Sequence, residues 1–375
     1  MIDTVILSVP REKIKTINDN KFPKWHLHST GKGYCKRIKN TSEDELNMGL
    51  SSVKLTGFTQ SNSSKKFKQG VNIEFSVPKL IKGDNLNEVE ELDFPLIVKT
   101  LQERLKNMGE IISQKNLESA TVSAFHPSKN IILSDGYTAS AVIKELSKIN
   151  VSKKFDKTDV VFSNDGSSLQ IRTQSHSIVF YDKLADIIKD KKKAIDKNPS
   201  QYQKSLFTEI KNKMPLLEIL RFEVRLSSKR KMKEVMKKMN FTERPVFRDI
   251  IKRDVCQKIV SWYWEEIIKG ENLFLFELIN SPKRLIRKIV KENMSIKGKQ
   301  AIFLVGLSIL SKDEGGIREL RDILSRCTKQ RSWYRLADDI KILNKISNKQ
   351  SLHSWVQQID QTIKSFDPLR IKVNN

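Results

Sequence analysis

The sequence predicts an α+β fold, in which an N-terminal antiparallel sheet with flanking helices (residues 1–230) is followed by an all-α domain (residues 240–375). Segments rich in β-branched residues recur through the first part of the chain. Helical periodicity replaces them from about residue 228. A chain of 375 residues is long enough for two hydrophobic cores, because single domains usually run to about 100–200 residues.

The N-terminal part is predicted to consist mainly of strands joined by turns. Helical spacing indicates helices at Phe94–Ile112 and Thr138–Ile149, with Thr138 as the N-cap of the second. Residues 11–50 are irregular, and KWHLHSTGKGY is typical of a loop or hairpin. Alternation and β-branched content predict strands at Ile2–Val9, Val53–Thr59, Val71–Val77, Thr121–Phe125, Ile131–Leu133, Asp159–Phe162, Ser168–Thr173, Ser177–Tyr181 and Leu217–Leu226.

The rest of the chain, from about residue 228, is predicted to be helical. No internal repeat or low-complexity tract interrupts it, and the domain boundary is expected near residues 228–242. The predicted helices lie in SSKRKMKEVMKKM, FRDIIKRDVCQKIVSWYWEEIIK, FELINSPKRLIRKIVKE, KGKQAIFLVGLSILSK, IRELRDILSRC and SWYRLADDIKILNKI.

The composition indicates a polyanionic partner and a reducing compartment. Lys and Arg total 69 against 44 Asp and Glu, which gives a formal net charge of +25. An ordinary basic protein from an AT-rich genome is the alternative. Three separated cysteines form no zinc motif, and the N-terminus lacks the features of a signal peptide. The most apolar stretch, Ala301–Leu310, is too short to span a bilayer, so we expect a cytoplasmic protein with no membrane partner.

Strand alternation predicts which polar residues share one face of the sheet. In VNIEFSV, Glu74 points away from the apolar residues, and in LRFEVRL the residues Arg221, Glu223 and Arg225 share the polar face. His126 follows a short strand and Tyr181 ends another. Glu74, His126 and Glu223 could therefore form a metal site beside a nucleophilic phenol. The alternative is a solvated polar face with cross-strand ion pairs.

A second candidate metal site is the pair His26 and His28. Alternate positions on one strand can aim two imidazoles at one metal, as in nucleases that use a His–hydrophobic–His triplet. The flanking Pro23, Ser29 and Gly31 instead favour a loop.

The C-terminal part contains a pair of short amphipathic helices with the size of a helix-turn-helix. GIRELRDIL and SWYRLADDIKIL are separated by the basic turn SRCTKQR. An ordinary helical hairpin with Trp333 in its core is an equally good interpretation. Residues Trp262–Trp264 lie in mid-helix, where at least one ring is expected in the core. The candidate DNA-contacting residues of the pair are Lys329, Arg331, Trp333, Tyr334 and Arg335.

Several segments, taken together and in order, resemble the II/X family of replication initiators from filamentous phages and small plasmids, the gene II-type replication proteins. MIDTVILSVP is similar to the opening strand of that family, and VNIEFSVPKLIKGDNLNEV to its glutamate-bearing strand. TVSAFHPSKNI looks like its central element, and IVFYDKL followed by LRFEVRL matches its YDK…RFE pair. The helical part, with GLSILSKDEGGIRELRDIL and SWYRLADDIK, is similar to the family's C-terminal domain.

The resemblance implies a metal-dependent enzyme that nicks and rejoins DNA to start rolling-circle replication. The nucleophile position falls on Tyr181, with Lys183, Arg221 and Arg225 near the phosphate. Glu74, Glu223 and the acid-or-His position at His126 would hold Mg²⁺ or Mn²⁺, and Tyr202 and Tyr137 are reserve nucleophiles. The implied partners are double-stranded origin DNA, displaced single strand and host helicase or polymerase. A non-catalytic DNA-binding regulator and an RNA-binding protein remain alternatives.

Overall fold

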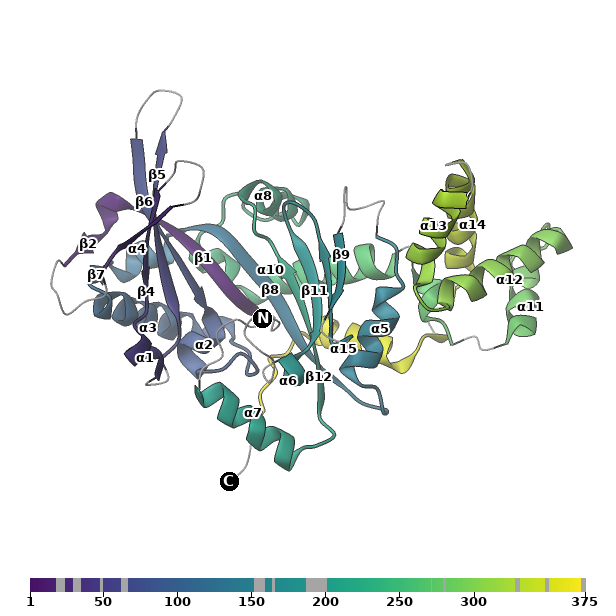
Figure 1. The fold of residues 1–375 in the computed structure, drawn as a ribbon, viewed down its shortest axis with the longest axis horizontal. Coiled ribbons are helices and arrows are strands. Elements are labelled where there is room, and N and C mark those ends of the chain that lie inside the picture. Colours follow the sequence, from purple (N-terminus) through teal and green to yellow (C-terminus); the bar gives the residue numbers. More distant parts are fainter. Residues whose placement is uncertain are drawn as a thin grey trace.

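A long antiparallel sheet organises the molecule (Figure 1). The computed structural model describes residues 1–17, 24–29, 35–47, 50–61, 67–151, 159–163, 166–186, 201–270, 272–278, 281–327, 331–347 and 351–371. In this part of the chain the sheet has 10 strands in the order β3-β4-β5-β6-β1-β8-β12-β11-β10-β9. The first and last segments of the N-terminal part, β1 and β12, both pair with β8 and so lie at the centre of the sheet.

The strands confirm most of the sequence-based expectations. Strand β8 differs, because it is one continuous element where two short strands around HPSKN were predicted. The two-stranded sheet pairs β2 (Lys15–Thr16) with β7 (Glu110–Ile111). The long sheet consists of β1 (Ile2–Pro10), β3 (His26–Ser29), β4 (Cys35–Asn40), β5 (Val53–Ser61), β6 (Phe67–Ser76), β8 (Thr121–Leu133), β9 (Asp159–Ser163), β10 (Ser168–Arg172), β11 (Ser177–Asp182) and β12 (Glu218–Arg225).

Helices and connecting turns of the N-terminal part surround the sheet. The Thr138 hydroxyl accepts a hydrogen bond from the Ala141 amide at 3.1 Å, which confirms the predicted N-cap of α5. The helices are α1 (Glu43–Asn47), α2 (Val77–Lys82), α3 (Phe94–Asn107), α4 (Gln114–Glu118), α5 (Ala139–Ser147), α6 (Lys183–Asp186) and α7 (Gln201–Lys213), with 3₁₀ turns at Arg11–Lys13 and Glu91–Asp93.

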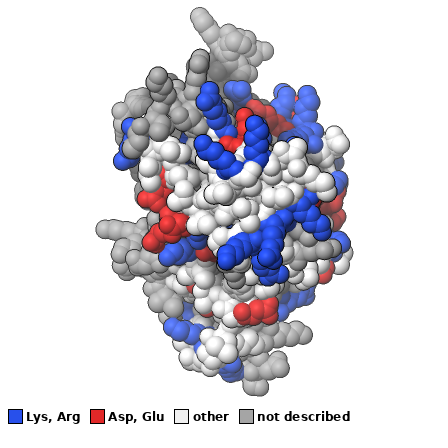
Figure 2. All heavy atoms as spheres, turned by 90° about the vertical axis from the view of Figure 1, so that its right-hand side faces the viewer, with Lys and Arg blue, Asp and Glu red and all other residues white. Residues whose placement is uncertain are grey.

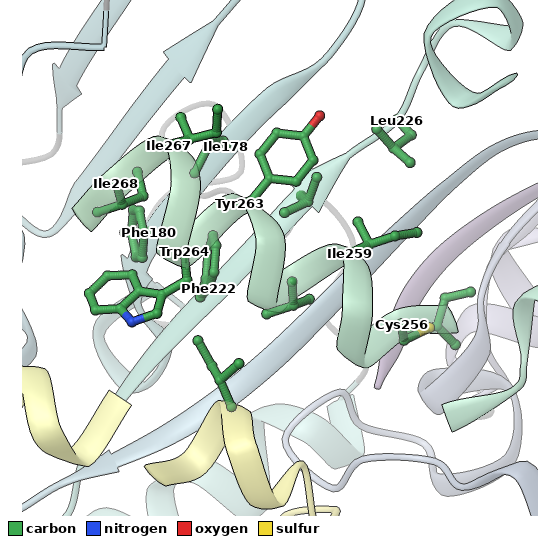
Figure 3. Packing of buried hydrophobic residues seen from close by; sticks show 14 of the residues in the cluster. Ile178, Phe180, Phe222, Leu226, Cys256, Ile259, Tyr263, Trp264, Ile267 and Ile268 are labelled. Atoms are coloured by element: carbon green, nitrogen blue, oxygen red, sulfur yellow. The ribbon is translucent and has the colours of Figure 1, made fainter. Parts of the chain in front are cut away.

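Helices from both parts of the sequence cover one apolar face of the sheet. Phe180 and Phe222, from neighbouring strands, stack with ring centroids 4.6 Å apart, and Trp264 packs edge-on against both. Figure 3 shows Trp264 and its helix lying across these strands. Trp264 also donates a hydrogen bond to Asp360 at 2.6 Å. The sheet and these helices therefore share one hydrophobic core, which continues across the boundary expected at residues 230–240.

The C-terminal helices divide into two groups. One group packs on the sheet, and the other, α11–α14, extends beyond the sheet at one end of the molecule (Figure 1). No helix among the described residues has both the length and the apolar character needed to cross a bilayer. The helices are α8 (Lys229–Lys238), α9 (Phe247–Ile250), α10 (Arg253–Trp262) with its π-helical continuation Tyr263–Lys269, a 3₁₀ turn at Leu273–Phe276, α11 (Pro282–Glu292), α12 (Gly298–Lys312), α13 (Gly316–Cys327), α14 (Arg331–Ile346) and α15 (Ser354–Ser365).

Candidate active site

Cross-strand register brings a row of polar residues together on the face opposite the aromatic core. Glu223 of β12 lies opposite Ser128 of β8, and Arg221 lies opposite both Asn130 of β8 and Tyr181 of β11. Directly opposed residues in an antiparallel pair point to the same side. The alternation inferred from LRFEVRL therefore holds, because Arg221 and Glu223 share a face with Tyr181 while Phe222 points into the core.

Asp3 joins this face through an irregularity in β1. The pairing of β1 with β8 shifts register between Ile2 and Val5, where β8 contains Pro127. A bulge of this kind adds a residue between two inward-pointing positions. Ile2 and Val5 are both buried in the core, and the two residues between them are only partly buried. Strict alternation would group Asp3 with Val5, so sequence pattern alone did not identify this acid.

Asp3, His126 and Glu223 form a compact group of possible metal ligands. One ligand atom from each of these residues lies within 4.8 Å of the others. His126 Nδ1 is 3.2 Å from Glu223 Oε1. The three residues come from β1, β8 and β12, three neighbouring strands at the centre of the sheet.

Arg221 lies beside this group and forms a hydrogen bond with one of its members, Asp3. The arginine residue is 1% exposed. It donates hydrogen bonds to Asp3 Oδ1 at 2.6 Å, to the Ser128 hydroxyl at 3.0 Å and to the Asn85 carbonyl at 2.8 Å. These donors face inward in this structure, and a contact between Arg221 and DNA stays a prediction. The position of Arg221 fixes the carboxylate of Asp3.

Surrounding charges determine the protonation of Glu223. Burial alone would raise the pKa of Glu223, but Arg225, His126 and Arg221 outweigh burial and hold it well below its ordinary value. The Arg225 Nε lies 2.9 Å from Glu223 Oε1, and this arginine is 23% exposed. Glu223 is therefore a carboxylate at neutral pH, as a metal ligand must be.

Tyr181 is buried among charged groups and lies outside the main hydrophobic core. The residue is 2% exposed. Burial raises the pKa of its phenol well above the ordinary value, and Glu223 and Asp3 raise it further, whereas Arg221 lowers it. The phenol is therefore neutral in the free protein at neutral pH. Lys183, predicted to lie near a bound phosphate, is also buried, with its amine 5.4 Å from the centroid of the Tyr181 ring.

A pocket of about 640 Å³ opens over this face. Glu74 lies in its wall but outside the three-ligand group, and its carboxylate is 3.9 Å from the amine of Lys54. The compact group therefore contains Asp3 where strand alternation predicted Glu74, and a metal-binding role of Glu74 stays a prediction. The pocket is lined by Asp3, Thr4, Asn40, Thr41, Leu46, Ser52, Lys54, Glu74, Phe75, Ser76, Lys79, Asn85, His126, Tyr181, Glu223 and Arg225.

The other candidate residues of the N-terminal part lie away from this group. His26 and His28 are on β3, which is an edge strand of the long sheet and pairs with β4. Of the two predictions for this segment, a loop or a hairpin, the structure agrees with the hairpin. The His26 side chain is exposed. Tyr202 is 52% exposed on α7. The Tyr137 hydroxyl lies 3.2 Å from His353 Nδ1, and neither tyrosine lines the pocket.

The candidate DNA-contacting residues of the C-terminal part have mixed outcomes. Trp333 is 8% exposed and packs in the core beside the guanidinium of Arg321, as the helical-hairpin interpretation predicts. Arg335 is exposed on α14. Lys329 lies outside the described residues, as do the side chains of Arg331 and Tyr334. Tyr263 and Trp264 are both fully buried, which agrees with their interpretation as core.

The sequence of the N-terminal part matches a family of replication proteins. The family described as the N-terminal part of the replication-associated gene II protein matches residues 1–243, and the chain belongs to this family. The matched segment contains all the strands of the described residues and all the residues that line the pocket. The chain is thus a rolling-circle replication initiator of the filamentous-phage gene II type. Comparisons with curated proteins and with solved structures find no match.

Proposed function

We propose that this initiator nicks and rejoins origin DNA in a divalent-metal-dependent reaction, with Tyr181 as the nucleophile. One observation carries the proposal: the Tyr181 phenol and three potential metal ligands line the same pocket. A phosphotyrosine ester keeps the energy of the broken phosphodiester, so the strand can later be resealed without a cofactor that supplies energy.

The residues present fit Mg²⁺ or Mn²⁺. Two carboxylates and an imidazole are donors that both ions accept, and the imidazole favours Mn²⁺. Ligands about 2.1 Å from one ion lie within about 4.2 Å of each other. The donor atoms of Asp3, His126 and Glu223 are within 4.8 Å of one another, so a small contraction would suffice. A bound ion would polarise the scissile phosphate and stabilise the charge that develops on the leaving oxygen.

The protein's own residues supply the remaining chemistry. The Tyr181 oxygen attacks phosphorus, the bond from phosphorus to the 3′ oxygen breaks, and the 5′ phosphate becomes joined to the tyrosine. The phenolic proton is lost to solvent and the leaving 3′ oxygen takes up a proton. Arg225, which lines the pocket and is partly exposed, is placed to hold a phosphate oxygen. In the reverse step a 3′ hydroxyl attacks the phosphotyrosine and releases the phenol.

The test uses supercoiled DNA of the replicon that encodes the chain, with Mg²⁺ or Mn²⁺. We expect relaxed circles and a covalent protein–DNA adduct, with mass spectrometry placing the nucleotide on the peptide that contains Tyr181. Tyr181→Phe should abolish nicking and adduct while DNA binding persists. Tyr202→Phe is the matched control and should nick at the wild-type rate.

Two results would contradict the proposal in different ways. Full nicking by Tyr181→Phe would remove this residue from the reaction. Salt-sensitive origin binding without cleavage under either metal would identify a DNA-binding regulator instead.

A further inference from the structure

The exposed face of α12 is apolar and has no partner among the described residues. Ile302, Phe303, Ile309 and Leu310 are 64%, 46%, 49% and 56% exposed. At 100° per residue these four side chains and Gly306 fall on one side of the helix. Figure 2 views the end of the molecule formed by α11–α14, where an uncharged area lies between two groups of Lys and Arg side chains. The segment is the apolar stretch that the sequence analysis found too short to cross a membrane.

The apolar face is arranged symmetrically about Gly306. Ile302 and Phe303 lie four and three residues before it, and Ile309 and Leu310 lie three and four residues after it. Two exposed charges of opposite sign lie farther out, with Lys299 in the first turn of α12 seven residues before the glycine and Asp313, the C-cap residue, seven residues after it. A two-fold axis through Gly306 would place each apolar pair against the other pair, and Lys299 against Asp313 of a second copy.

Gly306 itself has no intramolecular explanation in the described structure. A Cβ built at this position meets no atom within 4 Å. Glycine in a helix interior is less stable than alanine. A glycine at the centre of a helix face lets a second helix approach closely, whereas lipid or DNA needs no such notch.

We infer that two copies of this chain associate through antiparallel α12 helices that cross at Gly306. In this contact the apolar pairs of the two helices bury each other, and the Lys299–Asp313 ion pairs between the copies favour the antiparallel orientation. A stable interface buries about 800 Å² on each partner, and one helix face offers less. The association is therefore weak, with a dissociation constant on the order of 10–100 µM. It becomes effective when two copies sit on one DNA molecule, a consequence that rests on the proposed function.

The first test measures self-association of the full chain by sedimentation equilibrium without DNA. Phe303→Glu should weaken association at least tenfold, while Ile323→Glu, at a 52% exposed apolar residue of α13, should not. Gly306→Ala should raise the melting temperature of the dilute monomer and also weaken association. Because these two effects have opposite signs, a folding defect cannot imitate them.

The second test asks for the antiparallel arrangement. Lys299→Asp and Asp313→Lys should each weaken association severalfold, because each places like charges together. An equimolar mixture of the two variants should associate as well as wild type, since mixed pairs restore opposite charges at both contacts. This rescue requires two intermolecular pairs and does not depend on nicking.

Three outcomes would overturn the inference. The chain could stay monomeric to about ten times the expected dissociation constant. The charge variants could fail to rescue each other on mixing. Alternatively, Phe303→Glu could abolish sedimentation with vesicles of anionic phospholipid while leaving self-association unchanged, which would assign the face to a membrane surface.

Discussion

Glu110 and Glu223 are two buried acids of the sheet region, each within a cluster of polar side chains, and the two clusters differ in what the carboxylate oxygens contact. Glu110 accepts hydrogen bonds from the Lys39 amine at 2.8 Å, the Trp25 indole at 3.0 Å and the Thr16 hydroxyl at 2.7 Å. Glu223 is equally buried but lies in the wall of a pocket, beside two more potential ligands. A buried carboxylate is thus a candidate site only where its neighbours leave it open to a ligand.

The first prediction breaks the enclosed cluster. Lys39→Met removes the cation that also binds the Met108 carbonyl at 2.9 Å, and it leaves buried Glu110 without its nearer charged partner, with only Arg11 at 3.9 Å. We expect a loss of about 3–5 kcal/mol in the free energy of unfolding, measured with urea. Nicking per folded molecule should stay within about twofold of wild type. A fall in activity beyond the loss of folded protein would mean that the two clusters are coupled.

The second prediction breaks the open cluster. Asp3→Asn and Glu223→Gln should each lower the nicking rate by about 100-fold or more, because each removes a charged ligand from a three-ligand site. Raising the Mn²⁺ concentration should restore part of the loss, which a purely structural role would not allow. The double variant His26→Gln/His28→Gln is the control and should nick normally. Loss of activity in that control would move the metal site to the edge hairpin.

The sequence predicted the central part of this site but missed one member. Alternation in LRFEVRL placed Arg221 and Glu223 correctly, because β12 is regular and lies at the centre of the sheet. Asp3 was missed because the bulge in β1 breaks that alternation. The bulge begins after Ile2, which pairs with Pro127, a residue in the segment between the two short strands that were predicted where β8 is continuous. A proline normally indicates an edge strand or a break, and only the pairing partner reveals that the strand continues.

The C-terminal part was predicted less well, for a different reason. Periodicity identifies helices but not the surface that each apolar face covers. Trp264 packs on Phe180 and Phe222 of the sheet, whereas Trp333 packs within the group of helices beyond it. Both are aromatic residues in amphipathic helices, so the sequence alone could not assign α10 to the sheet and α14 to a separate bundle.

The third prediction concerns pH and follows from the buried phenol. Burial and the nearby acids hold the pKa of Tyr181 above its ordinary value, so the reactive phenolate is a small fraction of molecules near neutrality. That fraction grows about tenfold per pH unit below the pKa. The nicking rate at saturating metal should therefore rise between pH 7 and 9, by up to about tenfold per unit. Glu223 stays ionised across this range, because its pKa is lowered, and adds no second transition. A rate that is flat with pH would mean that proton loss from the phenol is not limiting.

The smallest predicted effect distinguishes Glu74 from Asp3, the two acids that compete for one role. Glu74 and Lys54 are 44% and 46% exposed and lie 3.9 Å apart, so their ion pair is screened by solvent. We expect Glu74→Gln to change the free energy of unfolding by less than about 1 kcal/mol, and the nicking rate by less than about threefold. Glu74 and Asp3 both line the pocket. Of these two acids, Asp3 is the one that accepts a hydrogen bond from Arg221 and lies beside His126 and Glu223. If Glu74→Gln instead abolishes nicking while Asp3→Asn does not, the metal lies nearer β6, and the ligand assignment made from strand alternation is restored.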